Sequence, residues 1–259
     1  GSIWATFRLA GAPAGHPDSK GFAVTDVSST SLAQPVADPY QRGVIWDLDG
    51  TLIDSSKLHY DAWRELLAPE GVDLDWPGFI TGFGRRNDDW LPDLLGPEIA
   101  MDDIRRIGDA KEARYREMVH EGGLDVLPGV FDALRGLRAD GWRHAVATSA
   151  PVENAGVILE VTGLSEFMDS FAGSEDVERG KPAPDVFLLA AERIGVAPER
   201  AVVVEDAAAG VQGAHRAGMV AIGVGPHHAD LGADRSAESL VDLPVETFSD
   251  LVLAASELA

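Results

Sequence analysis

The fold of this chain is decided by the stretch GVIWDLDGTL, which occupies residues 43–52. It opens with an apolar run, which indicates a strand that is buried on both faces of a sheet. Asp47 and Asp49 follow this run directly, and Gly50 indicates an early turn. We therefore expect the first acidic cluster of the chain at the carboxyl end of its first strand.

The sequence beyond this stretch falls into two parts with different patterns. From about Ser56 to Asp125 the apolar residues recur at spacings near three and four, which predicts helices and no strand. After Leu127 helices and short strands alternate, as is typical of a parallel sheet with helices on both faces. The predicted strands cover 144–147, 201–204 and 220–224, with a short apolar segment near Phe171, and the predicted helices cover 130–139, 153–161, 184–194, 207–217 and 248–258.

These patterns together predict an α/β fold. A doubly wound, Rossmann-like parallel sheet forms the core, and an all-helical cap is inserted directly after the first strand. We assign residues 43–57 and 126–259 to the core and residues 58–125 to the cap. Residues 1–42 mix Gly, Ala, Pro, Ser and Asp with little periodicity, so we expect a loosely ordered N-terminal extension there.

Composition narrows the range of partners. The chain has 259 residues with 43 acidic and 21 basic side chains, and its net charge of -22 disfavours nucleic acid and anionic membranes. It has no cysteine, no apolar stretch of the roughly 20 residues that a membrane span needs, and no start of signal-peptide type. We expect a cytoplasmic protein that acts as a monomer or homodimer.

Further polar groups follow two other predicted strands. Thr148 and Ser149 come after the strand at 144–147, and Glu205 and Asp206 come after the strand at 201–204. Ligands of an open parallel sheet bind beyond the carboxyl ends of its strands. Carboxylates gathered there repel one another unless a divalent cation lies between them, and oxygen ligands of this kind suit Mg²⁺. The sequence therefore predicts a magnesium site at this edge.

A phosphate ester is the substrate that such a site favours. Mg²⁺ is commonly bound by one or two carboxylates together with a phosphate of the substrate. A carboxylate can also attack phosphorus and form an acyl phosphate. Lys181 lies in a stiff Gly-Lys-Pro loop, from which its ammonium group could contact phosphate oxygens. We therefore expect a small phosphorylated substrate.

Each of these motifs also has an ordinary structural interpretation. Asp-x-Asp-Gly is a common turn, although its glycine comes too early for a calcium-binding EF-hand loop. Thr148-Ser149 and Glu205-Asp206 could simply cap the helices that follow them, and Lys181 could be a surface lysine. Only their occurrence as an ordered set favours the functional interpretation.

As an ordered set, the motifs resemble those of the haloacid dehalogenase-like superfamily. They are DLDGTL (47–52), Thr148-Ser149, Lys181-Pro182 and Glu205-Asp206. The sequences GKPAPD (180–185) and EDAAAG (205–210) resemble in particular the branch that contains beta-phosphoglucomutases and small sugar-phosphate phosphatases. The resemblance covers roughly residues 43–225 and implies a mobile helical cap, which agrees with the insert inferred from the helical pattern.

The resemblance implies a role for each motif. Asp47 is expected to be the nucleophile, and Asp49 the general acid and base. Thr148 is expected to bind phosphate, and Lys181 to neutralise charge. The implied ligands of Mg²⁺ are Asp47, the Asp49 carbonyl and Asp206, with Glu205 beside them. The other substrate-binding candidates at this edge are Gly50, Thr51, Ser149 and Asn154.

The predicted cap offers candidates of its own. His59 and Trp63 lie one helical turn apart near the hinge, and they resemble a pair that in the mutases helps to control the acid-base aspartate and the sugar site. Arg85, in Gly84-Arg85-Arg86-Asn87, could bind a distal phosphate or carboxylate. Equally, His59 could be a buried structural histidine, Trp63 cap core and the arginines a solvated turn.

Two enzymatic functions remain open, and a phosphatase is the first hypothesis. In a phosphatase, Asp47 takes the phosphoryl group and water then hydrolyses the aspartyl-phosphate. The alternative is a beta-phosphoglucomutase-type mutase, in which a second sugar hydroxyl attacks and Arg85 holds the far phosphate. The mutases carry a lysine shortly before that arginine, where this chain has Thr81-Gly82-Phe83. A dehalogenase would need neither Asp49 nor Glu205-Asp206, and a catalytically silent scaffold fits poorly with a complete set of motifs.

Overall fold

The computed structural model describes residues 41–83, 85 and 87–258. All of these lie in one unit of the chain, which spans Pro35–Ala259. The predicted N-terminal extension lies outside the described residues except for Gln41 and Arg42. Gly84 and Arg86, which were considered with Arg85 as cap residues, also lie outside them.

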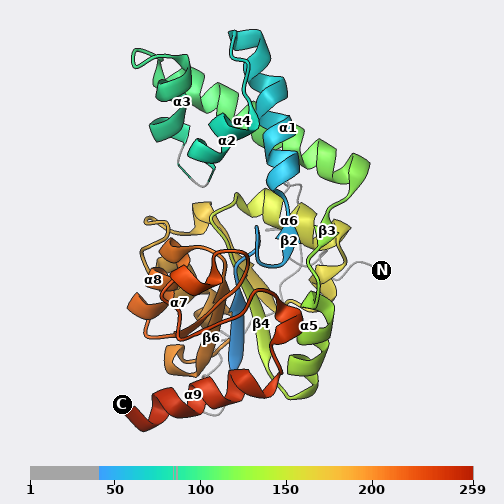
Figure 1. Ribbon diagram of the computed structural model, residues 1–259, viewed down its shortest axis with the longest axis vertical. Helices are drawn as coiled ribbons and strands as arrows, with labels where there is room; N and C mark the ends of the chain where they lie inside the picture. The colour runs from blue at the N-terminus through green and yellow to red at the C-terminus, as the bar shows by residue number, and fades with distance from the viewer. Residues whose placement is uncertain (1–40, 84, 86, 259) are drawn as a thin grey trace, which may run out of the picture. The chain divides into compact units, whose positions relative to one another are not determined.

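The core is a six-stranded sheet with the strand order β5-β4-β1-β6-β7-β8 (Figure 1). Every neighbouring pair in it is parallel, and β1 lies between β4 and β6. The parallel sheet predicted from the alternating pattern is therefore confirmed. The sheet gains a short edge strand, β8, that the sequence pattern did not indicate. The strands are β1 (Gly43–Trp46), β4 (Arg143–Ala147), β5 (Ser170–Ala172), β6 (Ala201–Glu205), β7 (Val220–Gly223) and β8 (Arg235–Ser236).

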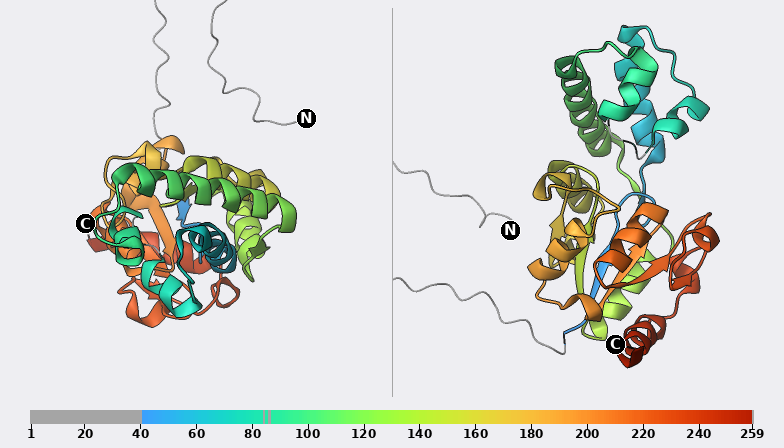
Figure 2. Two further views of the ribbon diagram at one scale, coloured as in Figure 1. Left: turned by 90° about the horizontal axis from the view of Figure 1, so that it is seen from above. Right: turned by 90° about the vertical axis from the view of Figure 1, so that its left-hand side faces the viewer.

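Helices cover both faces of this sheet (Figure 2). Successive residues of β1 point to opposite faces, so Val44 and Trp46 pack in the cluster with α5, α6 and α9, whereas Ile45 packs with α7 and α8. Because both faces are apolar, the central strands read as continuous apolar runs. This confirms the doubly wound α/β fold. The helices are α5 (Val130–Ala139), α6 (Val152–Val161), α7 (Asp185–Arg193), α8 (Ala208–Arg216) and α9 (Glu246–Leu258).

A helical insert follows β1 and has an apolar cluster of its own, centred on residues such as Leu67, Phe79 and Trp90. The insert is joined to the core by two short strands, β2 (Ile53–Asp54) and β3 (Asp125–Val126), which pair antiparallel. The sequence pattern predicted neither strand, because two residues are too few to show a period. The helices of the insert are α1 (Ser56–Leu67), α2 (Trp76–Gly82), α3 (Asn87–Leu95) and α4 (Met101–Gly122).

Short 3-10 helices complete the connections between these elements. Across the described residues, no helix combines the length and the apolar composition that a membrane crossing requires. The 3-10 helices are η2 (Ala68–Glu70), η3 (Leu164–Glu166), η4 (Ser174–Asp176), η5 (Pro198–Arg200), η6 (His228–Asp230) and η7 (Leu240–Asp242).

Candidate active site

Asp47 lies directly after β1, at the carboxyl edge of the sheet. Its backbone N–H donates to the carbonyl of Val204 on β6 at 2.9 Å, which continues the strand pairing to the first residue of the loop. The loop then turns at Gly50, whose φ of 85° favours glycine. A Cβ atom on residue 50 would lie 2.1 Å from Oδ2 of Asp206, so the turn also brings two motifs into contact.

Three carboxylates from β1 and β6 meet at this edge. Asp47, Glu205 and Asp206 each offer an oxygen, and these oxygens lie within 4.8 Å of one another. Burial raises the pKa of Asp47 well above its ordinary value, and Glu205 and Asp206 raise it further, although Lys181 opposes them. Burial and the charge of Glu205 raise the pKa of Asp206 to about 7. A divalent cation would relieve this repulsion, so the donor set fits the predicted metal site.

Lys181 joins the same cluster from the loop before α7. Its Nζ donates to Oδ1 of Asp47 at 2.5 Å, to Oε1 of Glu205 at 2.7 Å and to the carbonyl of Ala147 at 3.0 Å. Burial lowers the pKa of Lys181, but the two carboxylates outweigh burial and leave the pKa above its ordinary value. Glu205 also accepts from the N–H of Ala207 at 2.8 Å, so both of its oxygens are engaged. The ammonium group therefore stays charged beside Asp47.

Asp49 faces the hinge with the insert. Its carboxylate accepts a hydrogen bond from Ser55 and lies 3.6 Å from Nε2 of His59, on α1. Burial raises the pKa of Asp49, but hydrogen bonding and the charge of His59, together with Ser55, outweigh it and hold the pKa below its ordinary value. The pKa of Asp49 therefore depends on His59, a residue of the insert.

A buried lysine on α4 orients His59. Nζ of Lys111 lies 2.8 Å from Nδ1 of His59, so Nδ1 acts as the acceptor and the ring proton sits on Nε2, toward Asp49. Burial and the charge of Lys111 hold the pKa of His59 below its ordinary value. The imidazole also stacks on Tyr115 with a centroid distance of 4.0 Å. The sequence analysis did not identify Lys111, although a lysine within the buried stripe of α4 was a usable signal.

The loops after β1 and β4 supply neutral groups. Thr148 is buried, and its hydroxyl accepts from the N–H of Ala150 at 3.0 Å, while Ser149 is exposed beside it. The hydroxyl of Thr51 is buried and has no hydrogen-bond partner among the described residues. Thr148 and Ser149 line a cavity beside helix α4 and are available to a ligand there, whereas the Thr51 hydroxyl is closed off from solvent.

A cavity of about 900 Å³ lies between helix α4 and the loops that follow β4 and β5. Thr148, Ser149 and Lys181 line it from the core, and Arg85 lines it from the insert. One face of α4 forms the opposite wall, at spacings of three and four residues. That face consists of Met101, Ile104, Arg105, Gly108, Asp109 and Glu112.

Two predicted substrate-binding residues are engaged elsewhere in this structure. Trp63 packs in the apolar cluster of the insert, edge-on to Trp90 at a centroid distance of 5.2 Å. Asn154 is fully buried on α6, where its side chain donates to Glu112 at 2.6 Å and accepts from Arg116 at 2.8 Å. Neither residue is among those lining the cavity. Their proposed contacts with substrate therefore remain predictions.

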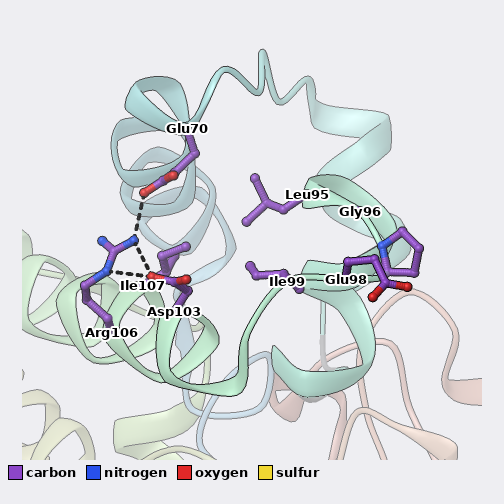
Figure 3. Close-up of a pocket in the computed structure, with 9 residues that line it drawn as sticks. Glu70, Leu95, Gly96, Glu98, Ile99, Asp103, Arg106 and Ile107 are labelled. Atoms are coloured by element: carbon purple, nitrogen blue, oxygen red, sulfur yellow. Dashed lines mark hydrogen bonds and ion pairs between the residues drawn. The ribbon is translucent and has the colours of Figure 1, made fainter.

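A second cavity, of about 520 Å³, lies within the insert (Figure 3). Arg106 points between Glu70 and Asp103 there and bonds to them at 3.1 and 3.3 Å (Figure 3). Leu95, Ile99 and Ile107 are among its apolar lining residues. This cavity holds none of the predicted site residues, so the candidate active site is the one at the edge of the sheet.

The fold and the site place an acidic cluster at the edge of a doubly wound sheet that carries a helical insert. The family model for haloacid dehalogenase-like hydrolases matches residues 41–218, a range that contains all the motifs described above. The chain belongs to the haloacid dehalogenase-like hydrolase family, and the resemblance found in the sequence is confirmed.

Among its relatives is the fructose-1-phosphate phosphatase YqaB of Escherichia coli, which is 34% identical over 71% of this chain and 98% of that protein. The beta-phosphoglucomutase of Bacillus subtilis is 29% identical over 79% of this chain and 92% of its own length. The crystal structure of a beta-phosphoglucomutase from Clostridium difficile is similar with a TM-score of 0.74 and 25% identity, covering 84% of this chain and 99% of that one. Sugar-phosphate phosphatases and mutases thus both occur among the relatives.

Proposed function

We propose that this protein is a Mg²⁺-dependent phosphatase of small phosphorylated metabolites, with sugar phosphates as the main class. The observation that carries this proposal is the contact of Lys181 with Asp47 and Glu205, beside the Asp206 carboxylate. It offers a nucleophile, a fixed cation and a donor set for a metal around one point. The relatives named as phosphatases of phosphorylated sugars support the substrate class.

Mg²⁺ would be held by Asp47, the Asp49 carbonyl and Asp206, with Glu205 beside them. The close approach of Asp206 to Gly50 supports this assignment, because a side chain at residue 50 would push that carboxylate away. When bound, the cation would screen the repulsion between the carboxylates and the phosphate and would polarise a phosphoryl oxygen.

The reaction then needs two steps. An oxygen of Asp47 attacks phosphorus, the bond from phosphorus to the ester oxygen breaks, and the leaving oxygen takes a proton from Asp49. The protonated form of Asp49 is the minor one at neutral pH, because its pKa is held below the ordinary value. In the second step Asp49 takes a proton from water, and the water oxygen attacks the phosphorus of the aspartyl-phosphate. Inorganic phosphate leaves and the carboxylate of Asp47 is restored. Lys181 stabilises the negative charge throughout, and Thr148 donates to a phosphoryl oxygen.

The insert is proposed to act as the cap of the site. His59 and Lys111 connect it to Asp49, so the proton position on Asp49 depends on where the insert lies. Closure over the cavity would exclude bulk water and bring α4 onto the substrate. We also propose a cytoplasmic location, with small molecules as partners and neither nucleic acid nor membranes, which the charge of -22 supports.

Phosphate release from a panel of sugar phosphates and nucleotides tests this function. We expect Mg²⁺-dependent release, and we expect Asp47→Asn to lower it by at least about 10³-fold because the nucleophile is lost. Asp54→Asn, at an exposed carboxylate on β2, is the matched control and should retain activity. Failure to release phosphate from any ester, or full activity in Asp47→Asn, would refute the proposal.

A mutase is the second candidate, because beta-phosphoglucomutases are among the similar proteins. In that reaction the phosphoryl group of Asp47 passes to a second hydroxyl of the sugar. If the protein is a mutase, conversion of beta-glucose 1-phosphate to glucose 6-phosphate, with a bisphosphate activator, will be faster than the release of inorganic phosphate from the same substrate. The two assays run side by side separate the candidates.

A further inference from the structure

The cavity between α4 and the core is unevenly charged. Lys181 is bonded to Asp47 and Glu205, so the other cations that line the cavity, among the residues that the structure describes, are Arg85 and Arg105. The carboxylates that line the same cavity outnumber these two. They are Asp88, Asp109, Glu112 and Glu178.

Both arginines already have carboxylate partners. Arg85 bonds to Asp93 at 3.0 Å and donates to the carbonyl of Asp89 at 2.6 Å. Nη1 of Arg105 lies 3.3 Å from Oδ1 of Asp102, which is one turn away on α4. A distal anion of a substrate would have to compete with these partners for either guanidinium group. The cavity therefore lacks a free cation for a second anion within the described residues.

Two of the carboxylates, by contrast, are free to meet a substrate. Asp109 lies on the cavity face of α4, and Glu178 lies on the core side, in the loop after η4. Both are exposed, and among the residues described here neither has a hydrogen-bond or ion-pair partner. They approach the cavity from its two walls. Glu112 differs, because Lys111 pairs with it at 2.9 Å.

The amide of Asn154 cannot compensate for these charges. It is held between Glu112 and Arg116, and Arg116 is also paired with Glu153 at 3.0 Å. A neutral donor and a cation near the cavity are thus both occupied by contacts between α4 and α6.

We propose that Asp109 and Glu178 determine which substrates this site accepts. They favour phosphate monoesters whose far end carries hydroxyl or ammonium groups, and they exclude those whose far end carries a second phosphate or a carboxylate. The inference rests on the proposed phosphatase function. A carboxylate accepts hydrogen bonds from hydroxyl and ammonium donors, whereas it repels another anion, and little in this cavity offsets that repulsion.

Three esters that differ in distal charge test this directly. Glucosamine 6-phosphate, glucose 6-phosphate and 6-phosphogluconate share a six-carbon chain and an ester at its sixth carbon, but their far ends are cationic, neutral and anionic. We expect kcat/KM to be at least about tenfold lower for 6-phosphogluconate than for the other two, as for one unscreened charge contact in a partly buried site. Equal or faster turnover of 6-phosphogluconate would overturn the proposal.

Substitution of Asp109 and Glu178 tests whether these two residues cause the discrimination against an anionic far end. In the double variant Asp109→Asn/Glu178→Gln, the kcat/KM ratio of glucosamine 6-phosphate to 6-phosphogluconate should fall at least about fivefold. The control Asp132→Asn/Glu166→Gln changes the net charge equally at exposed sites that do not line the cavity, and it should keep the ratio. An unchanged ratio in the first variant would overturn the assignment.

Failure of the proposed function has a different signature, because no ester would then release phosphate. In that case the dissociation constants of the three esters, measured by calorimetry with the Asp47→Asn protein, still report the charge order. Weakest binding of 6-phosphogluconate would support the proposal without turnover, and equal or tighter binding of it would refute it.

Discussion

The carboxylate of Asp206 reaches the loop after β1 because residue 50 has no side chain. A Cβ there would lie 2.1 Å from Oδ2 of Asp206, and a Cβ on residue 210 would lie 1.7 Å from Oε1 of Glu205. Two glycines thus make room for Glu205, the last residue of β6, and for Asp206, which follows it. The geometry of the acidic cluster depends on these close approaches as well as on the carboxylates themselves.

Replacing Gly50 by alanine separates this close approach from backbone strain. Gly50 and Gly71 both have φ of 85°, but a Cβ on residue 71 would meet no atom within 4 Å. We expect Gly50→Ala and Gly71→Ala each to lose about 1 kcal/mol of unfolding free energy, from the left-handed backbone alone. Only Gly50→Ala should also weaken Mg²⁺ binding, by about tenfold or more. Calorimetric titration of Mg²⁺ into both variants checks this, and equal affinities would contradict it.

The sequence predicted the position of some site residues and not of others. Asp47 and Asp206 could be placed at one edge because each follows a strand of a parallel sheet, and topology brings such ends together. Trp63 and Asn154 could not, since the direction of a side chain on a helix depends on what packs against it. Lys111 was missed because its role depends on a contact with His59, which lies 52 residues away in the sequence.

Helix α4 connects the insert to the core through separate faces. Lys111 and Tyr115 contact His59, Glu112 and Arg116 hold Asn154 on α6, and Asp109 faces the cavity. A shift of this helix would therefore change the hinge, the contact with α6 and the cavity wall together. Such coupling is what a cap that senses its substrate needs.

Substituting Lys111 by methionine tests the link from α4 to His59. Lys111 lowers the pKa of His59, so Lys111→Met should raise it, and NMR titration of the His59 ring measures the change. We also expect kcat to fall about tenfold, because His59 loses the donor that fixes its tautomer beside Asp49. Lys57→Met, an exposed lysine on α1 that pairs with Asp61, serves as the control. A His59 pKa unchanged by Lys111→Met would rule out this coupling.

Long helices and strands could be predicted from the sequence, and very short strands could not. The helices of the core and the strands β1, β4, β6 and β7 span enough residues for a pattern to appear, and they were predicted close to their observed bounds. The edge strands β5 and β8 have three and two residues, and the sequence showed only an apolar segment for β5 and no sign of β8. The strands β2 and β3 were not predicted either, because each has two residues and the whole insert separates them in the sequence. Local sequence carries no sign of such a distant partner.

The stability of the whole molecule should depend on pH through a buried histidine of the sheet. His144 on β4 is fully buried, and its Nδ1 accepts from Nε1 of Trp46 at 3.0 Å. Burial, together with the charge of Arg138, lowers the pKa of His144 to about 4. The neutral ring is therefore part of the packed core that holds β1 against β4.

Unfolding at different pH values measures this dependence. Below about pH 6.5 the unfolded chain binds a proton at His144, whereas the folded chain does not until about pH 4, so stability should decline as the pH falls between these values. The contribution is on the order of 3 kcal/mol. In His144→Gln this part of the pH dependence should vanish, and in the exposed control His227→Gln it should remain. Parallel pH curves for wild type and His144→Gln would contradict the prediction.

Asp47 is proposed to carry the phosphoryl group during turnover, and a chemical trap can detect it there. The protein can be quenched while it hydrolyses a sugar phosphate in Mg²⁺ and then treated with borohydride, which reduces an acyl phosphate to the alcohol. Peptide mass spectrometry should find homoserine at position 47, and none at position 49 or 206. Continued phosphate release with only unmodified aspartate at position 47 would contradict this role of Asp47.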